Sequence, residues 1–297
     1  MTSYAFLGAI EHGLLFSLMA LGVFLTFRAL DFPDLSVDGT FPLGAAVCAV
    51  FITKGYNPYL AVTIAAASGA IAGAITALLN TKLKILNLLS GILTMIGSYS
   101  IILRIMGMPN ISLLGYDTVY TPIENMGFAP QTASIVLASI FAVVTAVLLI
   151  WFFHTDLGLA LRAAGDNMKM VRAQGISTDR MTLYGVSFSN CLVSICGALA
   201  AQSLGFADVN MGIGTVVAGL ASVIVGEAAL SSRTVLKAVT GVIIGSMIYR
   251  MAVAYALSFQ IGDFRFAPGD LNIITVVIVV FALSFPRLRK KIGEVRQ

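Results

Sequence analysis

Charged side chains are scarce in this sequence. Asp, Glu, Lys and Arg make up 11% of its 297 residues, whereas hydrophobic residues make up 58%. A soluble domain could not hide that much apolar surface from water. The composition therefore excludes an ordinary soluble protein and indicates that a lipid bilayer surrounds most of the chain.

Residues that bind metals or carry covalent chemistry are also few. The sequence has two histidines, His12 and His154, and three cysteines, Cys48, Cys191 and Cys196. The cysteines are dispersed within apolar segments, which fits neither a disulfide framework nor a zinc site, so we interpret them as small core residues. Phosphate-binding glycine loops, nucleophile elbows and paired-histidine motifs are missing as well. We therefore expect no metal, no cofactor and no enzymatic activity in this chain.

Long apolar runs dominate what is present. Seven of them approach the ~20 residues that a helix needs to cross ~30 Å of hydrocarbon, and two more are shorter or rich in glycine. They are apolar on all sides and end at charges, so we expect helices and not the strands of a barrel. The long runs cover 4–27, 58–79, 85–106, 134–153, 181–203, 235–257 and 270–285, and the shorter ones cover 40–53 and 212–229. The sequence predicts an all-α polytopic membrane protein of about nine spans, with a range of about eight to ten, in a single transmembrane domain over 1–297.

The distribution of Lys and Arg predicts the orientation. If the C-terminus and the segment 155–176 are cytoplasmic, nine spans place all but four of the 18 Lys and Arg residues in the cytoplasm. Lys54 and Arg265 then lie outside, and Arg104 and Arg250 lie within spans. Such a bias toward cytoplasmic loops is typical of membrane proteins. It accounts for the net charge of +4 without nucleic acid as a partner.

The two segments at the outer side follow from this orientation. The run 4–27 has no basic region ahead of it and no small-residue cleavage site, so we expect it to be retained as a span that starts outside. The loop 107–133 is then external. Its prolines and glycines are typical of an irregular connection, and it has room for a short helix.

A polar interruption at 31–42 separates the first two apolar runs and contains three carboxylates, two hydroxyls and two prolines. Proline lacks a backbone donor, so a helix cannot run through unbroken. Irregular backbone is tolerated at membrane depth only where protein buries it or where it lines a water-filled cavity. The segment is either part of a transport pathway or an interfacial loop in which Asp or Ser caps the next helix. We favour the pathway, because the following run is too short to cross the bilayer alone.

A second interruption contains Asp208 and Asn210 and allows the same two interpretations. Seven positions of the first interruption match it with one gap: Phe32, Asp34, Leu35, Gly39, Thr40, Gly44 and Ala46 correspond to Phe206, Asp208, Val209, Gly214, Thr215, Gly219 and Ala221. In the nine-span topology the two copies enter from opposite sides, as in an inverted repeat with broken helices near the midplane. The alternative is chance similarity between Gly/Ala-rich segments.

Polar residues also lie within the apolar run 85–106. Asn87, Ser90, Ser98 and Ser100 either face a pathway or form ordinary hydrogen bonds between helices. Our candidates for the pathway or its gate are Asp34, Ser36, Asp38, Thr40, Phe41, Asn87, Ser90, Ser98, Asp208 and Asn210. Four charges within or near span ends, Glu11, Arg104, Glu227 and Arg250, are interpreted as anchors or ion pairs and not as a proton relay.

The segment 155–176 is a polar island between two apolar runs. On a helix beginning near Leu157, one face carries Leu157, Leu161, Ala164 and Met168, and the charges lie elsewhere on the wheel. The helix is expected to turn at Gly165 or Gly175. The polar island is either a docking surface or a helix that lies in the headgroup layer with snorkelling basic residues.

The residues of the polar island resemble a known motif. The run Gly158-Leu159-Ala160-Leu161-Arg162-Ala163-Ala164-Gly165-Asp166-Asn167, followed by Ala173-Gln174-Gly175-Ile176, resembles the coupling segment of ABC-importer permeases of the branched-chain amino acid and ribose type. Asp34-Leu35-Ser36-Val37-Asp38-Gly39 is similar to the broken-helix signature of these permeases, and the glycine-rich 212–227 and the ending 283–291 are similar as well. The run 30–42 is most similar to a subgroup of small amino-acid-type permeases, some of which work with binding proteins for aromatic amino acids.

The resemblance implies a homodimer in the bacterial cytoplasmic membrane, with two cytoplasmic ATPase subunits that bind ATP and Mg²⁺ and an extracytoplasmic substrate-binding protein. It implies import of a small polar solute, an amino acid or a related compound, by alternating access. The alternatives are a permease for a sugar or nucleoside, or a self-contained secondary transporter or channel. The polar island would be the coupling helix, and Gly165→Trp or Arg162→Glu is expected to uncouple ATP hydrolysis from transport. Its expected contacts with the ATPase are Leu157, Leu161, Arg162, Ala163, Gly165, Asp166, Asn167, Arg172 and Gly175.

Overall fold

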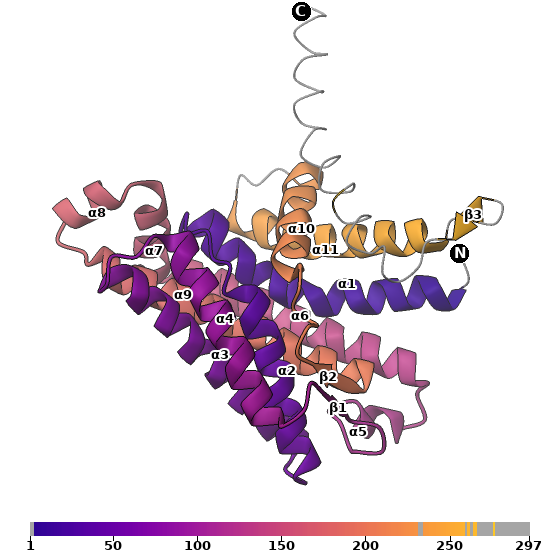
Figure 1. The fold of residues 1–297 in the computed structure, drawn as a ribbon. Helices are drawn as coiled ribbons and strands as arrows, with labels where there is room; N and C mark the ends of the chain where they lie inside the picture. Colours follow the sequence, from indigo (N-terminus) through magenta and orange to yellow (C-terminus); the bar gives the residue numbers. More distant parts are fainter. Residues whose placement is uncertain (1–2, 231–233, 259, 262–263, 266–275, 277–297) are drawn as a thin grey trace, which may run out of the picture.

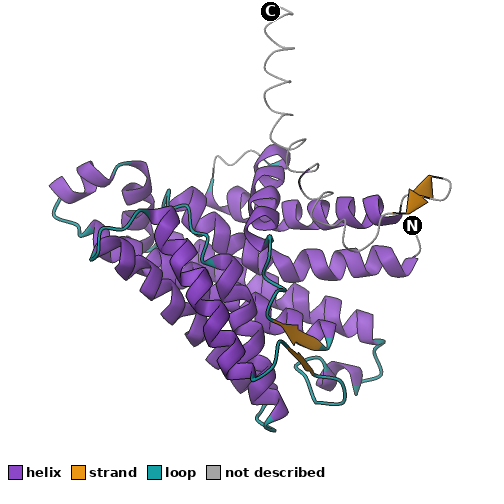
Figure 2. Ribbon diagram, in the orientation of Figure 1, coloured by secondary structure: helices purple, strands orange, loops and turns teal. Residues whose placement is uncertain are grey.

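The computed structural model describes residues 3–230, 234–258, 260–261, 264–265 and 276, and most of them are helical (Figures 1 and 2). The helices are α1 (Ser3–Val23), which continues as the π-helix η1 (Phe24–Ala29), α2 (Val37–Thr53), α3 (Pro58–Thr81), α4 (Asn87–Met106), α5 (Thr121–Glu124), α6 (Pro130–His154), α7 (Asp156–Asp166), α8 (Met168–Ala173), α9 (Thr178–Leu204), α10 (Thr215–Ala229) and α11 (Val235–Ser258). Short strands β1 (Asn110–Ser112) and β2 (Phe206–Asp208) pair antiparallel, as do β3 (Gln260–Ile261) and β4 (Phe264–Arg265).

The long apolar runs of the sequence became long helices. Within the described residues, six helices are long and apolar enough to cross a membrane, and α2 and α10 are shorter apolar helices. The predicted all-α polytopic fold is thereby confirmed. The expected span at 270–285 lies outside the described residues, so the total of about nine stays a prediction.

Local sequence signals set the ends of these helices. Asn57 accepts a hydrogen bond from the Tyr59 amide at 2.9 Å, and Pro58 occupies the first turn of α3, where it gives up no helical hydrogen bond. Gly205 ends α9 in the left-handed conformation, with φ of +77°. Such a residue without a side chain reverses the direction of the backbone at little cost.

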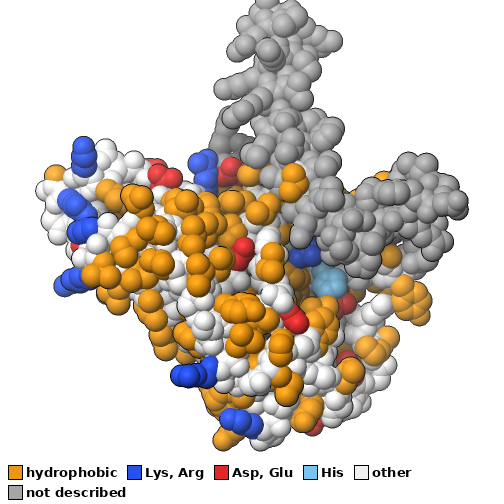
Figure 3. Space-filling view, viewed as in Figure 1, with side chains coloured by type: hydrophobic (Ala, Val, Ile, Leu, Met, Phe, Trp, Pro, Cys, Tyr) orange, Lys and Arg blue, Asp and Glu red, His pale blue; other side chains and the backbone are white. Residues whose placement is uncertain are grey.

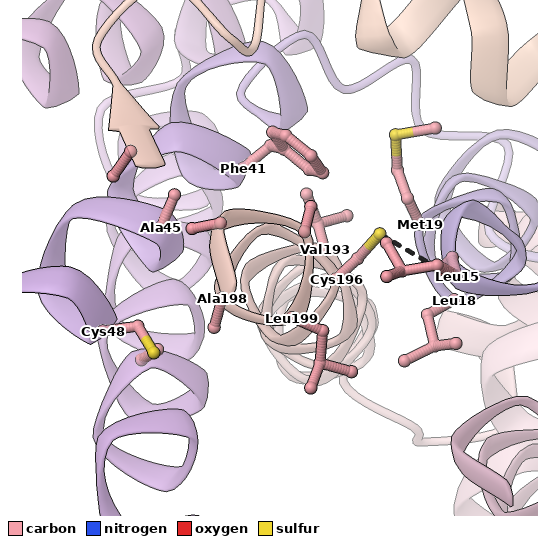
Figure 4. Close-up of a cluster of buried hydrophobic side chains, with 14 of the residues drawn as sticks. Leu15, Leu18, Met19, Phe41, Ala45, Cys48, Val193, Cys196, Ala198 and Leu199 are labelled. Atoms are coloured by element: carbon pink, nitrogen blue, oxygen red, sulfur yellow. Dashed lines mark hydrogen bonds between the residues drawn. The ribbon is translucent and has the colours of Figure 1, made fainter. Parts of the chain in front are cut away.

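The helix α9 is the centre of the molecule. Figure 4 shows Val193, Cys196 and Leu199 of α9 between Leu15 of α1 on one side and Phe41 of α2 on the other. The Cys196 thiol donates to the Leu15 carbonyl at 3.2 Å. Cys48 and Cys196 are buried and Cys191 is half-buried, and none is in a disulfide. Cys48 and Cys196 are the core residues that the sequence predicted, whereas Cys191 is not part of the buried core.

The packing follows the predicted internal repeat. In one half α2 and α3 pack on α9, and in the other half α10 and α11 pack on α1. The two central helices α1 and α9 run antiparallel, since η1 ends and α9 begins at the end of the molecule that carries α7 and α8 (Figure 1). Matched glycines occupy matched places: Gly44 of α2 packs against Ser194 of α9, and Gly219 of α10 packs against Val23 of α1. This exchange of partners between the two halves is the one that an inverted repeat predicts.

The loop expected at 107–133 extends from 107 to 129 and includes the short helix α5, as predicted, and the strand β1. Its pairing with β2, in the register Asn110 with Asp208, was not predicted. Tyr120 anchors the loop to α9 by donating to the Leu199 carbonyl at 3.2 Å. Burial raises the pKa of the Tyr120 phenol, so the hydroxyl keeps its proton for this bond.

The surface agrees with a membrane environment. On the face shown in Figure 3, most Lys and Arg side chains lie toward the end formed by α7 and α8 and at the opposite end, and hydrophobic side chains cover much of the region between them. Exposed apolar residues concentrate on α4 and α6. Lipid, rather than water, is the solvent that such a band requires.

Candidate functional site

The first break, residues 30–36 between η1 and α2, is held by a buried polar network. The Asp34 carboxylate accepts hydrogen bonds from the Ser36 amide and from the Asn190 side-chain amide, both at 2.8 Å. The Asn190 oxygen accepts in turn from the hydroxyls of Ser36 at 3.2 Å and Thr40 at 2.6 Å. All four residues are fully buried. The network satisfies the polar groups that a broken helix exposes, so capping describes Asp34, Ser36 and Thr40 better than contact with a solute.

Asn190 was missed in the sequence. It is the one asparagine within the apolar run 181–203, and nothing in that run indicates that it faces 34–40. Its position inside a span was the available signal, because a buried amide in a transmembrane helix needs a hydrogen-bonding partner.

The start of α2 is tied to the start of α10. The Asp38 carboxylate accepts from the Thr215 hydroxyl and the Val216 amide at 2.8 Å each, and from the Gly214 amide at 3.3 Å. A carboxylate placed there satisfies free backbone donors and favours the positive end of the helix dipole. The N-termini of both short helices therefore meet at one place.

The second break, residues 205–214 between α9 and α10, rests directly on α2. Pro42 has no amide to donate to the Asp38 carbonyl. Gly212 packs against that carbonyl and against the Pro42 ring, where a Cβ would collide. Asp208 accepts from the Asn210 amide at 2.7 Å, two residues ahead, as Asp34 does from Ser36. The two breaks thus repeat the same local turn.

A cavity of about 350 Å³ lies where the start of α2, the second break and α4 meet. Its polar residues are Asp38, Asn210 and Ser100, and its apolar wall comes mostly from α4. The remaining lining residues are Gly39, Pro42, Met95, Ile96, Tyr99, Ile102, Val209 and Ile213. Asp38 and Asn210 are the two predicted pathway residues on this wall. Tyr99 was not among our candidates, although an aromatic residue beside the polar positions 98 and 100 could have indicated it.

The other predicted pathway residues lie elsewhere. Phe41 is buried and stacks on Phe16 with ring centroids 5.5 Å apart. Ser90 is buried and donates to the Asn87 carbonyl at 2.7 Å, so it serves its own helix. Asn87 accepts from Asn80 at 2.6 Å near the polar island. Ser98 is buried and borders an apolar groove between α2, α3 and α4. Asp208 reaches Asn110 at 3.3 Å. None of these side chains lines the 350 Å³ cavity.

The predicted anchors behave in three ways. Glu227 forms an ion pair with Arg28 at 2.6 Å, and Glu11 accepts from the Ser203 hydroxyl at 2.6 Å. The Arg250 guanidinium lies 3.6 Å from the centroid of the Phe16 ring, a cation–π contact. Among the described residues, no group of three or more His, Cys, Asp or Glu could hold a metal ion.

The polar island forms two helices joined by a tight turn. The Thr155 hydroxyl accepts from the Gly158 amide at 3.3 Å and begins α7. The Asn167 side chain accepts from the Met170 amide at 3.1 Å and begins α8. Gly175 follows α8 with φ of +83°. The predicted turn at Gly175 is confirmed, and the alternative turn at Gly165 is wrong, because α7 continues through Gly165 to Asp166.

One face of α7 packs on its own molecule. Leu161 is only 1% exposed, and Ala164 is buried as well. A Cβ at Gly165 would collide with the Ala29 carbonyl oxygen. The predicted contacts of Leu161 and Gly165 with a partner are therefore wrong for this structure, because both residues face inward. Gly165→Trp would disturb this packing and is not a test of docking.

The outer face of α7 and α8 is available. Leu157 and Leu159 are each 51% exposed. The predicted contacts Arg162, Asp166 and Asn167 are exposed, Ala163 is half-buried, and Leu159 and Met170 were missed because they fall on the polar side of the predicted wheel. Arg172 is already engaged: it donates to the Thr178 hydroxyl at 2.6 Å and to Asp179 at 3.1 Å.

Comparison with known proteins identifies the family to which this chain belongs. The family model described as branched-chain amino acid transport system / permease component matches residues 6–284. The chain belongs to this family. The permease is 40% identical to the tyrosine transport system permease protein of Clostridioides difficile over 278 residues, which cover 94% of this chain and 90% of that protein. It is 27% identical to the probable branched-chain amino acid transport permease protein LivH of Methanocaldococcus jannaschii, over 65% of this chain and 64% of that protein.

A sugar permease is also among the relatives. The permease is 26% identical to the ribose import permease protein RbsC of Escherichia coli K12, over 78% of this chain and 71% of that protein. No solved structure matches the permease. These relatives are ABC permeases that depend on binding proteins, so the expected superfamily is confirmed.

In the permease, the polar island contacts η1, the helix that leads directly into the first break. The Gly165 backbone packs on Ala29, the last residue of η1. A Cβ at Gly185 of α9 would lie 2.9 Å from the side chains of both Leu161 and Leu30. The inner face of α7 therefore contacts η1 at the point where the chain enters the first break.

Proposed function

We propose that this permease is the membrane subunit of an ATP-driven importer that moves an amino acid into the cytoplasm by alternating access. The observation that carries this proposal is the 350 Å³ cavity between the start of α2, the second break and α4, next to the N-terminus of α10. Half-helix N-termini that converge within an inverted repeat are the arrangement in which transporters bind their solutes. The tyrosine permease among the relatives supports an amino acid as the solute.

The chemistry of the cavity fits an amino acid with a large apolar or aromatic side chain. Tyr99, Ile96 and Ile213 offer an apolar wall, and Tyr99 is 47% exposed. Asp38 places a carboxylate at one side, where it can attract an ammonium group, and Asn210 adds an amide. A sugar would need several polar groups around it, which this wall does not provide.

The proposal includes three kinds of partner. Two copies of the permease form the pathway, an extracytoplasmic binding protein delivers the solute, and two cytoplasmic ATPases bind ATP and Mg²⁺. The sequence has no nucleotide-binding motif. The outer face of α7 and α8, with Leu157, Leu159, Arg162 and Asp166, would dock on the ATPase. In the same orientation the C-terminus is cytoplasmic.

The test is uptake by the reconstituted complex. Full-length permease would be expressed with the ATPase and binding protein encoded beside it, and placed in liposomes with ATP on the ATPase side. We expect uptake of labelled tyrosine that requires ATP and the binding protein and that persists when ionophores collapse ion gradients.

The alternatives give different results in this assay. If the complex takes up ribose and not amino acids, the proposed solute is wrong and the permease imports a sugar. Uptake by the permease alone, driven by an ion gradient and abolished by ionophores, would overturn the ATP-driven mechanism in favour of secondary transport.

A further inference from the structure

An ion pair joins the two repeats at the end of the molecule that carries the polar island. The Arg28 guanidinium, in the last turn of η1, donates to the Glu227 carboxylate, in the last turn of α10, at 2.6 Å. Of the three ion pairs among the described residues, this one is the shortest. Arg28 and Glu227 are 199 positions apart, so the pair connects segments that the chain itself does not hold together.

The helix ends favour this pair. Both η1 and α10 end here, and the C-terminus of a helix carries partial negative charge. Glu227 alone is unfavourable at such an end, whereas a cation between two helix C-termini is stabilising. Separating η1 from α10 would leave Glu227 beside its own helix end without Arg28.

The pair borders a second cavity, of about 320 Å³. Arg162 and Asp166 of α7 line this cavity together with Arg28 and Glu227. The polar island therefore brings one cation and one anion to the same space as the pair. When Arg28 and Glu227 separate, each can face an opposite charge on α7.

The polar island also touches the residue next to Arg28. Gly165 packs so closely on the Ala29 carbonyl that a Cβ would collide with it. A shift of α7 must therefore move the end of η1, and with it Arg28. Because the ion pair is partly exposed, its side chains being 60% and 27% exposed, its strength is modest and a shift of η1 can break it.

We propose that the Arg28–Glu227 ion pair is a cytoplasmic latch, closed in this structure and opened by the polar island in each transport cycle. Alternating access requires one repeat to move against the other, and the latch is a contact between repeats away from the 350 Å³ cavity. Arg28 and Glu227 act as positioning residues, since neither lines that cavity. This inference rests on the proposed import function.

Reversible crosslinking tests the latch. Arg28→Cys and Glu227→Cys would be combined in a permease with Cys191→Ser, because Cys191 is partly exposed whereas Cys48 and Cys196 are buried. A short bis-methanethiosulfonate reagent would join the two new thiols, which lie at the ends of η1 and α10. We expect crosslinking to stop ATP-dependent uptake and a thiol reductant to restore the level seen before crosslinking.

The matched controls are the two single-cysteine variants, Arg28→Cys or Glu227→Cys in the Cys191→Ser permease, because one thiol alone cannot be joined across the pair. The same reagent on either variant is expected to leave its uptake at the level seen before treatment. If the permease with cysteines at positions 28 and 227 shows unchanged uptake after crosslinking, the proposed latch is overturned. Absence of ATP-dependent uptake before crosslinking, in wild type as well, would instead overturn the proposed function.

A charge exchange provides a second measurement. Arg28→Glu places two carboxylates together, and we expect about a two- to fivefold loss of uptake, as befits a partly exposed pair. The double variant Arg28→Glu with Glu227→Arg is expected to recover most of it. A double variant as impaired as the single one, at equal protein in the membrane, contradicts the latch.

Discussion

Asp34 and Asp38 are four residues apart and have different surroundings. Asp34 is fully buried within the network around Asn190, whereas Asp38 is half-buried, caps α10 and borders the cavity. A carboxylate that only satisfies buried donors contributes to stability. One that also faces a cavity can act on a solute.

Asp34→Ala is expected to lower the amount of folded permease. It removes the acceptor for the Asn190 and Ser36 amides, and a buried group left without its partner costs about 1–3 kcal/mol. The measurement is the yield of monodisperse protein in detergent and its thermal midpoint. Normal yield with a loss of transport would instead place Asp34 in the pathway, as the sequence suggested.

Asp38→Asn is expected to spare the fold and impair uptake. The amide oxygen can still accept from the Val216 amide and keep the cap of α10, but the negative charge beside the cavity is lost. Yield and ATPase activity in the reconstituted complex should stay near wild type. Uptake at the wild-type rate and affinity would show that the charge of Asp38 has no part in transport.

Tyr99→Ala is expected to raise the concentration of amino acid needed for half-maximal uptake. The ring is part of the cavity wall, and aromatic contacts contribute about 0.5–1.5 kcal/mol, which corresponds to a few-fold change. Tyr184 of α9 is a matched control, because it is equally exposed at 47% and lies outside the cavity. Equal effects of Tyr99→Ala and Tyr184→Ala would remove Tyr99 from the pathway.

At the scale of elements, the two faces of α7 have separate roles. Leu159 points away from the permease and Leu161 into it. We expect Leu159→Glu to leave the permease folded but to weaken ATPase binding and uptake together. Leu161→Ala should instead destabilise the permease, by about 2–5 kcal/mol for a buried leucine. Copurification of the ATPase, measured beside thermal stability, separates the two results, and reversed phenotypes would contradict this assignment of faces.

The long helices were predictable, because a helix that crosses a membrane requires a long run of apolar residues in the sequence. The runs at 58–79 and 235–257 became α3 (Pro58–Thr81) and α11 (Val235–Ser258), each within two residues at either end. The direction of side chains was less predictable. Periodicity placed Leu161 correctly on an apolar face, but it could not tell whether that face meets a partner or the permease itself.

Long-range partners were the least predictable feature. Asp34 could be recognised as a capping residue from its own neighbourhood, yet its partner Asn190 is 156 positions away. The same holds for Gly165, whose place against Ala29 follows from the packing of α7 on η1. Such contacts depend on which helices pack against each other, and this cannot be predicted from the sequence of one helix alone.

At the scale of the whole molecule, an inverted repeat predicts that equivalent substitutions in the two halves have similar effects on folding. Gly44→Leu and Gly219→Leu should both lower the yield of folded permease, because each glycine lies where a short helix crosses the central helix of the other half. Gly44 should be the more sensitive, since its neighbour is the Ser194 backbone and that of Gly219 is the Val23 side chain, at 2.8 Å.

Gly97→Leu is the control for this pair. A Cβ at Gly97 of α4 would meet nothing within 4 Å, so the larger side chain should be tolerated. The comparison is made on protein yield in the membrane. If Gly97→Leu lowers the yield as much as Gly44→Leu does, the larger side chain itself and not the helix crossing explains the loss, because leucine favours a helix more than glycine does.

The pairing of β1 with β2 has a consequence for how the two ends of the molecule are connected. It joins the loop 107–129 to the second break, and the Val209 amide donates to the Pro109 carbonyl at 3.0 Å. On the opposite side, α7 rests on η1 beside the first break. The loop 107–129 and the polar island thus each contact one of the two breaks with a single element between them. The two ends are connected at Asp38, because this residue of α2, just after the first break, caps α10, just after the second.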